Sequence, residues 1–147
     1  MAKFVSTDAI DRALQYIKCG GVNRVTGTGA PAALKMVVMN TTKSTGSPDK
    51  FVSLQGASHG WNLASAVLDS LDFVISVGDA GGNSRKIAVG AQSALDVVMS
   101  QTTATASEVA ICSPTAILLK TTCTAQLLTN GNTVTVPTFD DEIAAAT

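Results

Sequence analysis

The feature that most constrains the fold is a succession of short segments rich in β-branched residues, separated by residues that favour turns. Successive side chains of a strand point to opposite faces of a sheet, so such segments predict strands with one buried face. In residues 72–77, for example, Phe73 and Ile75 should point one way, and Val74 and Ser76 the other. We expect strands in 34–40, 51–55, 72–77, 85–91, 107–112, 115–123 and 132–139.

Turn-forming residues lie between these segments, in 45–49, 78–83, Ser113-Pro114 and Asn130-Gly131. Asn130-Gly131 predicts a tight hairpin, because both residue types accept the positive φ that such a turn needs. The glycine-rich loop 78–83 is followed by a predicted strand instead of a helix. It therefore indicates a hairpin tip and not a phosphate-binding loop. Many short strands without strand–helix alternation predict a mainly β fold, a β-sandwich or jelly roll.

Residues 61–71 have an ambiguous pattern. Leu63, Val67, Leu68 and Leu71 have helical spacing, whereas Leu63, Ser65 and Val67 alternate as in a strand. Because the surrounding chain reads as strands, we favour a strand or irregular structure here.

One short N-terminal helix is expected at about residues 6–18. Ser6, Thr7 and Asp8 offer oxygens for the N-cap, and Gly20-Gly21 provides a stop. The apolar side chains repeat every three to four residues and form one stripe, which should be buried against the sandwich or a neighbouring subunit. The stripe comprises Ile10, Leu14 and Ile17, with Ala13 alongside.

The 147 residues are most simply a single domain, 1–147, with the β-sandwich at about 22–143. Hydrophobic residues make up 46% of the chain and charged residues 14%, with a net charge of −1. Charged residues usually form about a quarter of a soluble domain. A weakly charged surface loses little hydration free energy on contact, which suits a protein that packs against partners.

Several functional classes do not fit this composition. Ten basic against eleven acidic residues, with no basic run, give no footprint for nucleic acid. The first residues lack the apolar core of a signal peptide, and no apolar run of about 18 residues is long enough to span a membrane. We therefore expect a soluble protein made in the cytoplasm, with neither nucleic acid nor membrane as a partner.

The sequence offers no catalytic, cofactor-binding or metal-binding residues that we would assign. His59 follows Ser58, but adjacent residues rarely form a nucleophile–base pair, and no Gly-x-Ser-x-Gly motif is present. A Cys₃His zinc site could in principle be made by Cys19, His59, Cys112 and Cys123, yet it would lack the close pair usual in structural sites.

We interpret the three cysteines as small buried hydrophobic residues, because an odd, unpatterned set argues against a disulfide framework. Neither Asp69 with Asp72 nor Asp140-Asp141-Glu142 has the alternating oxygen ligands of a calcium loop. The latter cluster is expected to be a solvated or partner-facing acidic patch that reaches neighbours from a free C-terminal end. We expect no enzyme and no cofactor.

Three stretches of the chain resemble a family of small phage virion proteins, the capsid decoration or cement proteins of short-tailed bacteriophages. They are residues 5–18, 63–95 and 118–144. The resemblance follows an opening helix, then Asp72-Phe73-Val74-Ile75, Asp79 and Arg85-Lys86-Ile87-Ala88-Val89, then the stretch from Thr124 to Ile143. Residues 26–60 depart from the family pattern.

The resemblance implies a sandwich or jelly-roll fold and a structural, non-enzymatic role. It implies a homotrimer bound to the major capsid protein on the outside of the virion, after synthesis in the cytoplasm of the host bacterium. Two other functions stay open: another virion component of the tail, neck or fibre attachment, and a β module that binds a ligand or glycan. A glycan module is less favoured, because sugar sites use exposed aromatic rings and aromatic residues make up 4% of the chain.

Overall fold

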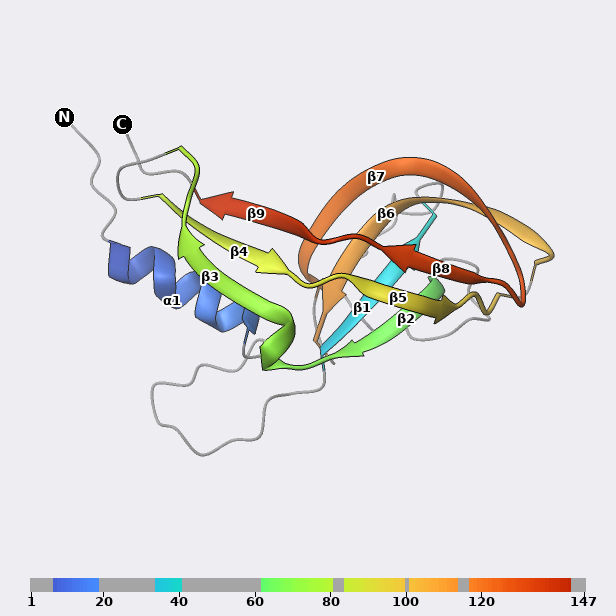
Figure 1. Cartoon of the computed structure of the whole chain (residues 1–147), viewed down its shortest axis with the longest axis horizontal. Helices are drawn as coiled ribbons and strands as arrows, with labels where there is room; N and C mark the ends of the chain where they lie inside the picture. The colour runs from blue at the N-terminus through green and yellow to red at the C-terminus, as the bar shows by residue number, and fades with distance from the viewer. Residues whose placement is uncertain are drawn as a thin grey trace.

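The computed structural model describes residues 7–18, 34–40, 62–80, 84–99, 101–113 and 117–143. These residues form one α-helix, a single 3-10 turn and nine strands (Figure 1), so the predicted mainly β, sandwich-like fold with one short helix is confirmed. The elements are α1 (Thr7–Lys18), β1 (Leu34–Met39), β2 (Asn62–Leu68), η4 (Ser70–Asp72), β3 (Phe73–Val77), β4 (Arg85–Val89), β5 (Gln92–Asp96), β6 (Thr103–Cys112), β7 (Ile117–Thr129), β8 (Thr133–Val136) and β9 (Phe139–Ile143).

The strands form three antiparallel sheets. Sheet A has the strand order β2-β1-β6-β7, sheet B the order β3-β4-β9, and sheet C consists of β5 and β8. Val97, the residue directly after β5, forms an isolated bridge with Ala64 of β2, which links sheet A to sheet C.

Sheets B and C share one long two-stranded ribbon. β4 pairs with β9 up to Val89–Phe139, and β5 pairs with β8 from Gln92–Val136, three residues further along both strands. The register is thus the same on both sides of the gap. We call residues 85–96 together with 133–143 the long ribbon; it crosses most of the molecule's length (Figure 1).

The gap in the long ribbon has a local cause. Pro137 stands opposite Ala91 in this register and has no N–H to donate to the ladder. Beside it, the N–H of Gly90 is turned to the carbonyl of Asp72, 2.7 Å away, and the Gln92 side chain donates to the Asp72 carboxylate at 2.9 Å. The end of η4 therefore fastens the ribbon where it bends.

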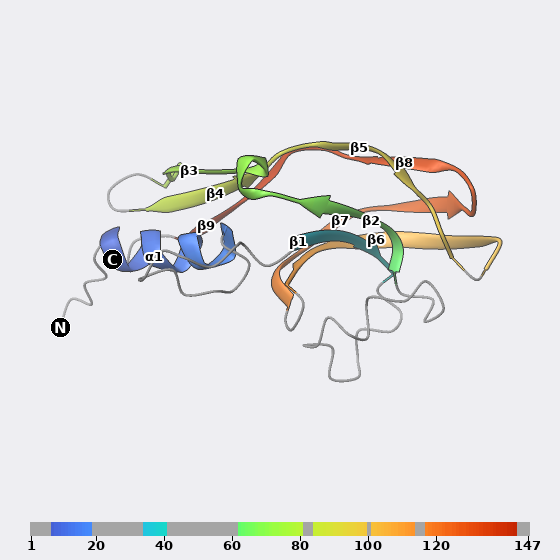
Figure 2. The ribbon, with the colours of Figure 1, turned by 90° about the horizontal axis from the view of Figure 1, so that it is seen from below.

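Two layers result from this arrangement. Figure 2 shows β3, β4 and β9 above α1 at one end of the molecule, and β5 and β8 above sheet A at the other. A single buried apolar cluster runs through both ends, from Ile10 and Leu14 of the helix to Val134 and Val136 of β8. The long ribbon therefore covers both halves of the core.

The helix is held to sheet B by apolar and charged contacts. Ile10 and Leu14 are buried and Ile17 packs against the same cluster, so the predicted stripe is buried against the sandwich, although Ala13 is exposed. Arg85 of β4 forms an ion pair with Asp11 at 3.1 Å. In the last turn, the Lys18 ammonium donates to the carbonyl oxygen of Phe73, 3.1 Å away.

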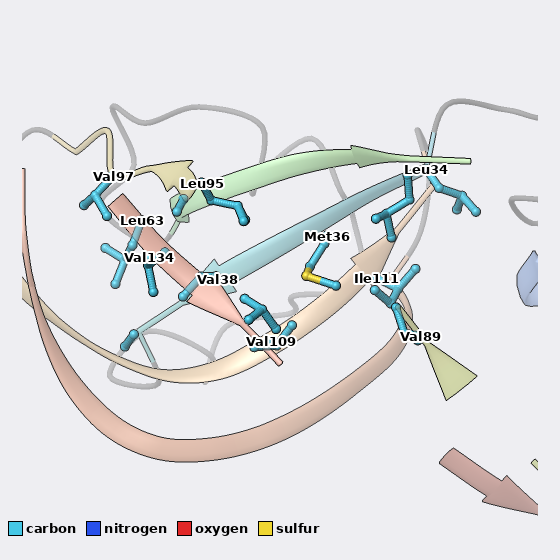
Figure 3. Close-up of a cluster of buried hydrophobic side chains, with 14 of the residues drawn as sticks. Leu34, Met36, Val38, Leu63, Val89, Leu95, Val97, Val109, Ile111 and Val134 are labelled. Carbon is cyan, nitrogen blue, oxygen red and sulfur yellow. The ribbon is translucent and has the colours of Figure 1, made fainter. Parts of the chain in front are cut away.

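The middle of sheet A is buried on both faces. Met36, Val38 and Ile111 face the long ribbon (Figure 3), where they meet Leu95 and Val134. The opposite face, which we call the far face, has its own buried cluster of Val37, Met39, Ala110 and Cys112. Two buried faces explain why residues 36–39 of β1 are a continuous apolar run and do not alternate.

The turn at Asn130-Gly131 forms, but the predicted hairpin is wrong. Asn132 N–H donates to Thr129 O at 3.1 Å and Gly131 has φ 86°, yet β7 pairs with β6 while β8 pairs with β5. The turn instead passes the chain from sheet A to sheet C. The turn is also hydrogen-bonded to Val97, whose carbonyl accepts from Gly131 N–H at 2.9 Å. A local turn signal cannot specify which strands pair.

Most other strand predictions agree with the structure. Residues 62–68 are the strand β2, which settles the ambiguity in favour of the alternating pattern. β3 and β4 pair as consecutive antiparallel strands, as a hairpin requires. β5 and β9 were not predicted, and residues 51–55 lie outside the described residues.

A β-bulge at Ala94 interrupts the long ribbon near its end. Between the pairs Gln92–Val136 and Leu95–Val134, two residues of β5 stand opposite one residue of β8. Ala94 sits in this bulge with φ 54°, the left-handed region that disfavours a Cβ by roughly 1–2 kcal/mol. The bulge is therefore locally strained.

Replacing Ala94 with glycine should remove that strain and leave the protein as stable as wild type or up to about 1 kcal/mol more stable. The matched control is Ala91→Gly, at an exposed position without positive φ, which should cost about 0.4–1 kcal/mol. Urea unfolding of both variants gives the comparison. Equal destabilisation by the two substitutions would show that the bulge is not strained.

Candidate interaction surface

The cysteines that the sequence raised as candidates differ in their surroundings. Cys112 is buried on the far face of sheet A, where burial raises the pKa of its thiol to about 12, as expected of a small buried hydrophobic residue. Cys123 lies exposed on β7, so the expectation of burial is wrong for this residue. Both are free thiols. Cys19 and His59 lie outside the described residues.

The acidic pair Asp69 and Asp72 has a structural role. The Asp69 carboxylate accepts from Leu71 N–H at 2.6 Å, and Asp69 N–H donates to the Asp72 carboxylate at 2.8 Å. The two side chains thus form a capping box around η4. Within the described residues, no group of three or more His, Cys, Asp or Glu side chains is placed to hold a metal ion.

A charged cluster joins β9 to the β3–β4 hairpin on the outer side of sheet B. Lys86 of β4 lies 2.8 Å from Asp79 and 3.4 Å from Asp140 of β9. Its hydrogen bond to Asp79 is the main reason that the pKa of Lys86 is raised. We call Asp79, Lys86, Asp140 and Glu142 the β9 clamp.

Glu142 completes the β9 clamp. Its carboxylate accepts from Ala80 N–H at 2.9 Å, and this bond, with a further one from Ser84, lowers the pKa of Glu142. A Cβ on Gly78 would collide with the same carboxylate, so any larger residue there would displace the Glu142 side chain from this position. The backbone of the hairpin and the end of the chain are thereby bound together.

The acidic stretch 140–142 is therefore not a free terminal arm. It forms part of β9, paired with β4 from Phe139 to Ile143. Asp140 and Glu142 are used within the chain, while Asp141 is exposed. The prediction of a free, extended acidic end was wrong, because three consecutive acidic residues interrupt the alternation by which a strand is recognised, and only Phe139 and Ile143 mark its apolar face.

The strand β7 is an edge of sheet A and has an irregular ladder. Between the pairs Ala106–Gln126 and Glu108–Thr122, three residues of β7 stand opposite one residue of β6. Such bulges bend a strand and re-aim its side chains, and β7 arches strongly in Figure 1. Among the described residues, no strand pairs with the other side of β7.

The part of β7 from Thr121 to Thr129, which we call the β7 edge, is uncharged. Every side chain from Thr122 to Leu127 is exposed, and Leu127 has 66% of its surface in contact with solvent. Exposed strand edges normally carry charges or proline that prevent pairing with another chain. The β7 edge carries neither, which makes it the best candidate for an interaction surface.

An ion pair between a buried glutamate and an exposed lysine joins β6 to β7. Glu108 of β6 is buried, and the Lys120 ammonium of β7 lies 3.3 Å from its carboxylate. Loss of water contact is the main reason that the pKa of Cys123 is raised, and the negative charge of Glu108 adds to it. Sequence reasoning missed this pair, although a lone glutamate within the apolar segment 107–112 was a usable signal.

No family model matches the chain, and no curated protein or solved structure matches it either. Within the part of the chain that the structure describes, no helix is long and apolar enough to cross a membrane. The candidate surface therefore has to be interpreted from its own chemistry.

The β9 clamp predicts a defined pH dependence of stability. At neutral pH, Glu142→Gln should be less stable than wild type, because a neutral amide is a weaker acceptor for Ala80 N–H. A carboxylate with a lowered folded-state pKa stabilises above its unfolded pKa, near 4.5, and loses that contribution as the pH falls through the folded value. The difference between the two proteins should therefore shrink below about pH 4.5.

Asp141→Asn is the matched control, since Asp141 is the exposed neighbour on the same strand. Urea unfolding at a series of pH values gives the stabilities of the three proteins. A Glu142→Gln effect that is the same at pH 7 and pH 3, or an equal effect of Asp141→Asn, would contradict the assigned role of Glu142.

Proposed function

We propose that this chain is a non-enzymatic structural protein of a bacteriophage virion, which binds the outside of the capsid as a homotrimer and stabilises the shell. Its partners are the major capsid protein and further copies of itself. The proposal rests on the sequence resemblance and on the structural observations that support it.

The observation that carries most weight is the convergence of the residues behind the resemblance. Asp79, Lys86 and the Asp140–Glu142 stretch belong to separate parts of the sequence pattern, yet they meet in the β9 clamp. Arg85 of the same pattern joins the opening helix through Asp11. A sequence pattern whose residues contact one another in the fold is what a structural framework produces, and this supports the proposal.

The use of charge within the chain also supports a role in contacts. Side chains of opposite sign are paired internally at Asp11–Arg85, Glu108–Lys120 and the β9 clamp. The β7 edge beyond Lys120 is uncharged and exposed. Burying such a surface against a partner removes few hydrated charges from water, which keeps the desolvation cost of binding low.

Many weak contacts suffice for this function. A micromolar contact contributes about 8 kcal/mol at standard state, and copies joined in a ring bind with far higher avidity than one copy. A rigid β structure also loses little conformational entropy on docking. A subunit of this kind that bridges neighbouring capsomers adds its binding free energy to the shell at every site it occupies.

The test uses heads of the encoding phage purified without this chain, to which the purified protein is added back. We expect saturable binding to the heads in sedimentation and a higher temperature of DNA release, because binding to the intact shell stabilises it by mass action. Bovine serum albumin at the same concentration serves as the control.

Two results would contradict the proposal. Heads that bind no added protein would exclude a role on the capsid exterior. Binding to isolated tails instead of heads would favour the alternative of a tail, neck or fibre-attachment component.

A further inference from the structure

We infer that copies of this chain associate head to tail by extending sheet A, with the β7 edge of one copy pairing with the β2 edge of the next. The inference deepens the proposed function and rests on its assembly of copies, for which it names the contact. It follows from how the molecule treats its sheet edges.

The two edges of sheet B differ from each other. β9 carries three consecutive acidic residues, Asp140 to Glu142, whose like charges oppose pairing with a second β9. At the other edge, the first carbonyl of β3, that of Phe73, accepts the Lys18 ammonium. β9 is therefore blocked by charge, whereas β3 is engaged at its first residue and is otherwise uncharged.

The two edges of sheet A are prepared differently. β2 carries no charged residue, and neither does the β7 edge. The outer side of β2 is occupied at Leu63 and Ala64, where Val98 N–H donates to Leu63 O at 3.0 Å and Val97 bridges Ala64. Among the described residues that pairing stops at Ala64, and Ser65–Leu68 extends beyond it with Val67 69% exposed.

The directions of the strands permit this continuation. Every neighbouring pair in the order β2-β1-β6-β7 is antiparallel, so β2 and β7 run in opposite directions. A β7 placed beside the β2 of another copy therefore makes an antiparallel pair, and the combined sheet alternates without interruption. Because two different edges meet, the contact is heterologous and generates a closed ring when the rotation between copies closes.

The charges at the ends of the two edges favour one register, in addition to their contacts within the chain, where Lys120 pairs with Glu108 and Asp69 caps η4. Lys120 is the only charged residue of β7, and Asp69 directly follows β2. When Lys120 of one copy lies opposite Asp69 of the next, Thr122 lies opposite Val67. The side chains that are paired in this register lie on the far face of sheet A. Lys120 stands opposite Ala110 of that face, and Val67 stands opposite Lys35, which is on the same face as Val37. Opposite charges across strands stabilise such a pair.

Two variants test the inference by complementation. Thr124→Lys/Gln126→Lys places charges on the β7 edge, and Ser65→Lys/Val67→Lys places them on β2. All four positions lie on strands and are exposed. Light scattering coupled to size exclusion gives the mass of each. We expect wild type to have three times the monomer mass, and each variant to have the mass of a monomer.

The decisive sample is the equimolar mixture of the two variants. Head-to-tail pairing leaves one intact β7 edge and one intact β2 edge in the mixture, so we expect a one-to-one dimer of twice the monomer mass. Thr135→Lys, at an exposed position of β8, should keep the mass of wild type. Circular dichroism and thermal unfolding of each variant establish that it is folded.

Three results would overturn the inference. They are a monomeric wild type at all concentrations, an unchanged mass of either folded variant, and a mixture that stays monomeric. If two β7 edges paired about a twofold axis instead, the folded β2 variant would keep the mass of the wild type. Wild-type protein that binds heads while any of these results holds would remove this inference and leave capsid binding, the other part of the proposed function, standing; a monomeric wild type would also remove the homotrimer.

Discussion

The long ribbon is the constraint on which the rest of the structure depends. Its two strands keep one register from Arg85–Ile143 to Gln92–Val136, although Pro137 interrupts the ladder between them. One half covers the helix and the other covers sheet A, so a slip of one residue would turn the apolar side chains of both halves to the wrong face. The contacts of Asp72 with Gly90 and Gln92 hold the bend.

Charge has a consistent place in this architecture. Ion pairs fasten the helix to β4, β7 to β6, and β9 to the β3–β4 hairpin. They lie between elements that are distant in sequence, where they favour one arrangement of those elements over others. β2 and the β7 edge of sheet A are left without charge, and these are the surfaces through which we propose that copies meet.

The sequence predicted what depends on local pattern. The stripe of Ile10 and Leu14 and the alternation of Phe73 and Ile75 follow directly from helical and strand periodicity. Pairing between distant segments could not be predicted from the sequence. Asn130-Gly131 specifies a turn, but it does not specify that β7 and β8 belong to different sheets. β9 was missed because its acids suggested a solvated patch, and their partners Lys86 and Ala80 are identified only by the fold.

The most direct test of the central claim is cryo-electron microscopy of the intact phage particle that encodes this chain. We predict density for the two-layered β structure on the outer surface of the head, at junctions between capsomers, with copies in rings of three. Density for this chain in the tail or neck, or a head exterior without it, would contradict the account.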